Sequence, residues 1–435
     1  DNAVTLAKMA SLARGSIIYG DSAGDPAALS IGSNGTVLKS DGTDVSWGAV
    51  SSGPTHKTFG TDSIMIGDTT TGTIDAANNN TGLGVDVFHS LTTGDDNTVL
   101  GKDAGQGTST GQRNVYLGID CGSAGNGSEN CLVGRRAGQN QTSSYITAVG
   151  TEALQNNTGT KNTAVGMQSL MANTSGNENT AVGYLALTAN QTGHYNTAIG
   201  MQALDTLNGG DRNVAVGREA CRDQASGSNN TGIGTEALKL NSTGFENVAV
   251  GSYCLNNNTG SNNTAVGTEC MKLNTSGTQN AAFGKAALIT NTNGNYNTAL
   301  GAYALKLLDG GDSNVSVGWS SGENVTSANN NTFVGYMAGQ TVTTGSQNIA
   351  VGYNAMGDGT CTGSYNVAMG YEALHNTTSG YENVCIGRDA GHDITSGYQN
   401  VSVGHESLTK MQSANQCVAV GFQALEKATA HSNVG

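Results

Sequence analysis

A short phrase of apolar and small residues recurs along the chain at an almost constant interval. Its clearest copies are NTAVG at residues 162–166, NTAVG at 179–183 and NTAIG at 196–200. The Gly that closes each copy falls at twenty-two positions, from Gly67 to Gly421. Of the twenty-one intervals between them, counted in sequence positions, sixteen equal 17, four equal 16 and one equals 18. Such a regular period is typical of a repeat protein whose units pack on their neighbours.

Within each copy the residues alternate in size, and a period of two predicts a β-strand. A large apolar residue stands just before the Gly, a small residue before that, and in most copies a β-branched residue one place earlier. We expect the large residues to fill the core and the Ala and Gly face to let a second backbone approach closely, so that several chains can pack side by side through this face. The predicted core column contains Val165, Val182, Ile199, Val216, Ile233 and Val250.

An Asn stands four residues before nearly every closing Gly. Stacked coils would place these side chains above one another, where each amide can bond its own turn and the turns of its neighbours. After the Gly, an Ala-Leu pair predicts a second inward step, and an Asn-x-Thr-Gly or Thr-Ser-Gly segment predicts the turn that follows. The predicted Asn ladder includes Asn162, Asn179, Asn196, Asn213 and Asn247.

Such a short repeat cannot hold two helices, but it fits one coil of a parallel β-solenoid or β-roll, with two short strands and two turns. The spaced leucines of a leucine-rich repeat, the Asp-rich turns of a calcium-binding roll and the Gly spacing of collagen are all missing. The sequence therefore predicts an elongated all-β solenoid. At about 4.8 Å per coil, its length would be roughly 100 Å.

The repeated phrase resembles known proteins. The short form, N-[ST]-[AV]-[AVI]-G, resembles the head repeats of trimeric autotransporter adhesins. The longer form, N-T-A-V-G-x-x-A-L-x-x-N-x-x-G, is more similar to repeats of bacteriophage tail fibres, notably those of marine phages. Residues 4–49 resemble an N-terminal module of fibre and structural proteins in phages of cyanobacteria. The resemblance implies a laterally packed or intertwined homotrimer.

The pattern divides the chain into two regions. Residues 1–60 are predicted to form an attachment module, with a short helix over residues 1–14 and strands around turns at 33–35 and 40–42. Residues 61–435 are predicted to form the repetitive region, and Ser-Asn-Val-Gly at 432–435 matches the start of another coil, so we expect the repeat to continue.

Composition narrows the possible functions. A formal net charge of −14 disfavours binding to nucleic acid or to an anionic membrane. No apolar run approaches the length of about 20 residues that a membrane span needs. We find no catalytic signature, metal-ligand spacing or cofactor motif, and we expect none of these. Glutamates two residues after the closing Gly (Glu152, Glu236 and Glu269) indicate a solvated face.

The eight cysteines are spread singly along the chain, and most occupy repeat positions where other copies carry small or apolar residues. We interpret them as buried filler. Cys254 and Cys270 share one position in successive repeats, so stacking could bring them within disulfide distance.

Aromatic residues gather directly after the closing Gly in the C-terminal half. Trp319, Tyr336, Tyr353 and Tyr371 occupy this position in consecutive repeats and should form a continuous stripe. The stripe could be a seam between chains, a stiffening stack or a track that binds a receptor glycan.

The leading hypothesis is a non-enzymatic shaft of a phage tail fibre, located on the virion. It would be homotrimeric, attach to other virion proteins through residues 1–60, and hold a tip that contacts a host glycan or protein. The main alternative is a trimeric adhesin on a bacterial surface. A tailspike depolymerase would need paired acidic groups in a groove. An ice-binding solenoid would need an exposed Thr array, whereas we expect the Thr column to face inward.

Overall fold

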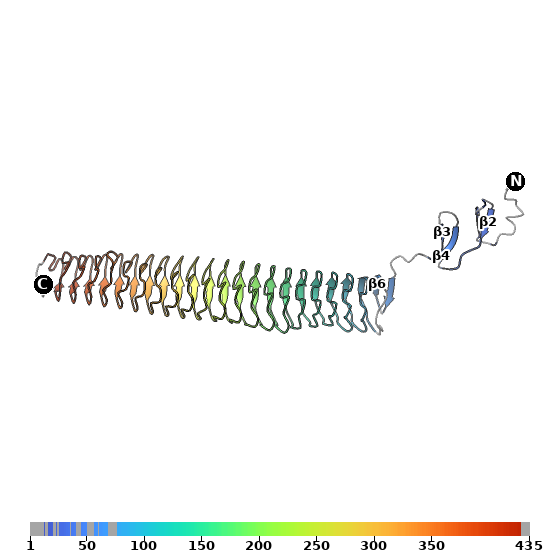
Figure 1. Ribbon diagram of the computed structural model, residues 1–435, viewed down its shortest axis with the longest axis horizontal. Helices are drawn as coiled ribbons and strands as arrows, with labels where there is room; N and C mark the ends of the chain where they lie inside the picture. The colour runs from blue at the N-terminus through green and yellow to red at the C-terminus, as the bar shows by residue number, and fades with distance from the viewer. Residues whose placement is uncertain are drawn as a thin grey trace.

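The computed structural model shows a long parallel β-solenoid whose coils follow one another in chain order (Figure 1). The structure describes residues 13, 16–20, 23, 26–34, 36–40, 45–49, 56–59, 61–67 and 76–427. The described residues form strands and turns without any helix. The predicted all-β solenoid, with one coil for each repeat of the sequence, is therefore confirmed.

Each coil contributes one strand to a single sheet that runs the length of the solenoid. Successive strands pair in parallel with a shift of one repeat, so that Thr163 lies beside Thr180 and Ala164 beside Ala181. The sheet begins with β5 (His56–Phe59), which pairs antiparallel with β6, and continues to β27. Its parallel strands are β6 (Ser63–Gly67), β7 (Thr81–Gly84), β8 (Thr98–Leu100), β9 (Val115–Leu117), β10 (Cys131–Val133), β11 (Thr147–Val149), β12 (Thr163–Val165), β13 (Thr180–Val182), β14 (Thr197–Ile199), β15 (Val214–Val216), β16 (Thr231–Ile233), β17 (Val248–Val250), β18 (Thr264–Val266), β19 (Ala281–Phe283), β20 (Thr298–Leu300), β21 (Val315–Val317), β22 (Thr332–Val334), β23 (Ile349–Val351), β24 (Val367–Met369), β25 (Val384–Ile386), β26 (Val401–Val403) and β27 (Val418–Val420).

The N-terminal region consists of short hairpins. Strands β1 (Ile17–Gly20) and β2 (Pro26–Leu29) pair antiparallel, as do β3 (Thr36–Ser40) and β4 (Val45–Ala49). The indole of Trp47 donates a hydrogen bond to the carbonyl of Ser30 at 2.6 Å and so ties the second hairpin to the first. Because β5 pairs with β6, the predicted boundary at residue 60 falls inside a hairpin of the solenoid. The helix predicted over 1–14 and the coil predicted to begin at 432–435 lie outside the described residues.

The predicted core column is wrong, because the strand face carrying the large residues points outward. Val165, Val182, Ile199 and Ile233 are 36–41% exposed, and Val216 and Val250 are half-buried. The central residue of each strand from β8 to β27, usually Ala, is buried instead, as at Ala164, Ala181 and Ala198. The core consists of this Ala together with the Ala-Leu pair that follows the closing Gly, such as Ala203 and Leu204.

The Ala-Leu segment forms consecutive turns rather than the predicted second strand. Both Ala203 and Leu204 point into the core, although successive residues of a strand face opposite sides. The chain achieves this through left-handed backbone, with φ of 55° at Gln202 and 51° at Leu204. Each such residue costs roughly 1–2 kcal/mol. Backbone hydrogen bonds to adjacent coils offset that cost, including those from Gln202 N to Tyr184 O and from Leu204 N to Ala220 O.

The closing Gly lets coils of the same chain approach each other. A Cβ at Gly200 would lie 2.4 Å from the carbonyl oxygen of Gly217 in the next coil. The Ala and Gly positions therefore face the interior and the adjacent coil of the same chain. The expectation that their face packs against another chain is wrong.

Core residues compensate one another in size within a coil. Tyr116 and Phe333 are buried at the strand position that Ala usually fills. Next to them, Gly122 and Gly339 replace the usual Leu, and a Cβ at Gly339 would lie 2.3 Å from the Phe333 ring. The interior of a coil has room for one large side chain, either from the strand or from the turn after the closing Gly. This limit explains why Ala on the strand faces Leu in the turn in most coils.

Candidate functional site: the buried amide ladders and the outer surface

The predicted Asn ladder is present and buried. The backbone N–H of Asn179 donates to Oδ1 of Asn162 at 2.9 Å, and Nδ2 of Asn179 donates to the carbonyl of Gly193 at 2.8 Å. Asn196 and Asn213 repeat these bonds one coil further along, and Asn247 does the same with Asn230 and Gly260. Each amide therefore joins consecutive coils and satisfies backbone groups that the core would otherwise leave unpaired.

A second buried column lies seven residues after the closing Gly, and the sequence reasoning missed it. In several coils it is an amide ladder, in which Nδ2 of Asn190 donates to Oδ1 of Asn173 at 2.9 Å. The sequence signal for this column is the Asn of the Asn-x-Thr-Gly segment, which fits a turn residue equally well. Elsewhere the column is apolar, at Leu207, Leu308, Val325, Val342, Ile394 and Met411.

The outward residues of strands β8–β27 form one long surface, which we call the outer sheet face. It has two columns, the first and the third residue of each strand, and both are rich in β-branched side chains. The Thr column lies on this face, so the expectation that it points inward is wrong. The column is still interrupted, for example at Val214 and Val248, and it is not the uniform Thr array that an ice-binding surface needs.

The aromatic stripe forms as one continuous stack beside the outer sheet face. Ring centroids are 5.1 Å apart for Trp319 and Tyr336, 5.2 Å for Tyr336 and Tyr353, and 5.1 Å for Tyr353 and Tyr371. The planes deviate by at most 13°, and each residue remains 42–47% exposed. Tyr303 extends the stripe with an edge-to-face contact to Trp319. The stripe offers a flat, exposed row of rings.

The glutamate column is more enclosed and more fully paired than the predicted solvated face. Each predicted glutamate forms an ion pair, and the side chains of Glu152, Glu236 and Glu269 are 17%, 16% and 34% exposed. Glu219 is 8% exposed and accepts from Lys239 at 2.8 Å and from Arg222 at 2.7 Å. In the next coil, Glu236 pairs with Lys239 and Arg218. The Lys239 bond lowers the pKa of Glu219 below its ordinary value. This contribution to stability is therefore present at neutral pH and is lost as the pH falls through the lowered pKa.

The cysteines are free, and most are buried as predicted. Burial raises the pKa of Cys121, Cys221 and Cys385 to about 12. A hydrogen bond with Cys270, together with burial, raises the pKa of Cys254, and these two thiols form no disulfide. Cys131 is the exception, because it occupies an outward strand position and is exposed.

We expect one thiol of the native chain to react rapidly with a thiol-specific dye at pH 8. The thiolate is the reactive form, and Cys131 alone of the eight is exposed. Dye counting on native and denatured protein measures this directly. Cys131→Ser should remove the rapid phase, and a remaining rapid phase would contradict the burial of the other seven.

The comparisons with known proteins found no match to a protein family, to a curated protein or to a solved structure. Within the described part of the chain, no helix is long and apolar enough to span a membrane.

Proposed function

We propose that this chain is the structural shaft of a bacteriophage tail fibre, which holds a receptor-binding tip away from the virion and has no catalytic role. The observation that carries the proposal is the continuous parallel pairing from β6 to β27, with partners one repeat apart at every step. A sheet that crosses every coil resists stretching and proteolysis through many main-chain bonds. The hairpins before the solenoid would attach it to other virion proteins.

In this proposal the working unit is a homotrimer that packs through the outer sheet face. Ile199, Val182 and Val165 expose apolar surface in consecutive coils, and this column of third strand residues continues along the solenoid. A contiguous apolar surface of this length is typical of an interface. A second copy presents the same surface at the same spacing, so repeating contacts can form along the whole rod.

We expect light scattering coupled to size exclusion to give three times 44.0 kDa, about 132 kDa, with the elution of a rod. Ile199→Lys should shift the mass toward 44.0 kDa, because it places a charge in the apolar interface. Asn208→Lys, at an exposed position outside that face, is the matched control. A native chain that is monomeric, or an Ile199→Lys variant that keeps the trimer, would contradict the packing.

The exposed aromatic stripe favours a second candidate, a trimeric adhesin on a bacterial surface, since stacked rings suit the flat faces of sugars. Gold-labelled antibodies against this chain distinguish the fibre proposal from the adhesin hypothesis. The fibre proposal expects label on the tails of virions, whereas label confined to cell envelopes supports the adhesin. Under the adhesin hypothesis, Tyr353→Ala should reduce binding on a glycan array, and Tyr184→Ala, outside the stripe, should not.

A further inference from the structure

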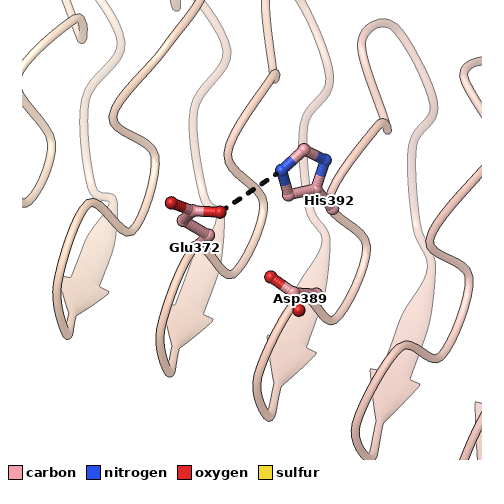
Figure 2. A group of neighbouring side chains, drawn as sticks. All are labelled: Glu372, Asp389 and His392. Carbon is pink, nitrogen blue, oxygen red and sulfur yellow. Dashed lines mark ion pairs between the residues drawn. The ribbon is translucent and has the colours of Figure 1, made fainter.

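Two groups of metal-ligating side chains lie near the C-terminal end of the described solenoid. The first contains Glu372, Asp389 and His392, and the second contains Asp389, His405 and Glu406. In each group, one ligand atom from every residue lies within 4.8 Å of the others. Figure 2 shows the first group, with Glu372 on one coil and Asp389 and His392 on the next. The two groups share Asp389, so the carboxylates of three consecutive coils form one acidic row.

This row has fewer fixed cations than the acidic groups around Glu219 and Glu236. Around Glu219 and Glu236, the cations Arg218, Arg222 and Lys239 pair with the carboxylates. Among the described residues, Arg388 is the one Arg or Lys that pairs with this row of Glu372, Asp389 and Glu406. The other ion-pair partners of these carboxylates are His392 and His405. Arg388 Nε lies 3.1 Å from Asp389 Oδ2. Stacked carboxylates repel one another, and a surplus of negative charge favours a bound cation.

The ring of His392 is held in the orientation that a metal ligand needs. Its Nδ1 lies 2.7 Å from Asp393 Oδ1, and a carboxylate can only accept, so Nδ1 carries the donated proton. The ring also stacks on His375 with centroids 4.8 Å apart. These contacts orient the ring so that Nε2 points toward the cluster, where it lies 3.7 Å from Glu372 Oε2. A carboxylate bonded to the far nitrogen is the usual outer-shell partner of a metal-binding His.

The separation between His392 Nε2 and Glu372 Oε2 fits a bridging ion better than it fits a direct hydrogen bond. At 3.7 Å, His392 Nε2 and Glu372 Oε2 are too far apart for a good hydrogen bond. Two ligands of a tetrahedral zinc ion, each about 2.0–2.2 Å from the metal, are separated by about 3.3–3.6 Å. In the adjoining group, His405 Nε2 is buried without a hydrogen-bond partner and faces Glu406 Oε1 at 3.4 Å.

We propose that Glu372, Asp389 and His392 bind a divalent transition-metal ion of the zinc class between two coils. One nitrogen and two carboxylate ligands leave a fourth position for water, and an imidazole ligand favours zinc over calcium. The ion links residues that are more than one repeat apart in the chain and neutralises the acidic row. It therefore joins the coils of β24 and β25 by a bond that the main-chain ladder does not provide.

The test is calorimetric titration of the chelator-treated full chain with zinc chloride, in a Cys131→Ser background that removes the exposed thiol. We expect one zinc ion per chain, because both groups need Asp389. His392→Ala and Glu372→Gln should each weaken binding more than 10-fold, and Asp393→Asn should weaken it by roughly 10-fold. Arg388→Gln should tighten binding, because it removes the cation that competes for Asp389.

The matched control is His89→Ala, an exposed histidine at the same repeat position in an early coil. It should leave zinc affinity unchanged, and circular dichroism should show that every variant retains the fold. Calcium should bind far more weakly than zinc. Absence of zinc binding, equal binding by His392→Ala, or equal affinity for calcium would each overturn the site.

Discussion

Replacing Gly200 with alanine is expected to break the stacking of the solenoid at that coil. The backbone has φ of +136° at Gly200, which side chains of L-residues rarely adopt, and a Cβ would lie 2.4 Å from Gly217 O and 2.7 Å from Gly217 C. Both atoms belong to the backbone of the next coil, so the clash is relieved only by separating the coils. We expect a loss of at least about 3 kcal/mol.

Because each coil contacts mainly its neighbours, this defect should divide the solenoid into two cooperative blocks. Chemical denaturation followed by circular dichroism should show two transitions, and limited proteolysis should cut near residues 200–217. Gly209→Ala is the control in the same repeat, where the nearest atom to a new Cβ is the Thr192 hydroxyl oxygen at 3.1 Å. An equal effect of the two substitutions would rule out the inter-coil clash as the cause.

We expect the second large effect from Asn213→Asp. This substitution keeps the shape of the side chain but removes the Nδ2 donor of the amide ladder. Nδ2 of Asn213 donates to Asn196 Oδ1 at 3.1 Å and to Gly227 O at 2.9 Å. A carboxylate would instead face these oxygens in a fully buried site. We expect a loss of about 3–5 kcal/mol in the free energy of unfolding at neutral pH, as for an uncompensated buried charge.

The pH dependence distinguishes this mechanism from a general loss of packing. Burial opposite carbonyl oxygens should raise the pKa of the new carboxyl in the folded state, and its protonated form can donate one of the lost bonds. The difference from the native chain should therefore shrink as the pH falls, with the sign set by the raised pKa. The exposed Asn208→Asp should have little effect, and a destabilisation by Asn213→Asp that is independent of pH would contradict this account.

The amide ladder and the aromatic stack were predictable because each depends on one repeated residue at one repeated position. Once coils stack in parallel, residues of one column must lie above one another, so Asn179 reaches Asn162 and Tyr353 reaches Tyr336. The choice of inward face was not predictable from alternation alone. Alternation separates Val165 from Ala164, but it does not state which of them meets the core.

The groups of metal-ligating side chains, which span two coils, could not be predicted from the sequence either. Glu372 and His392 are separated by more than one full repeat, and no short ligand motif joins them. Their approach depends on turn conformations, including φ of 49° at Glu372 and 52° at Asp389, that place the ligand atoms together.

By itself, the sequence determined the period, the parallel stacking and the columns, because a short repeat of nearly constant length leaves one way for identical residues to align. Only the tertiary structure decided which column is core. The closed coil is narrow, and a Leu such as Leu204 already fills one side, so the facing strand position has room for Ala198 and not for Val. That limit turns the β-branched residues outward and creates the long apolar face through which we propose the copies meet.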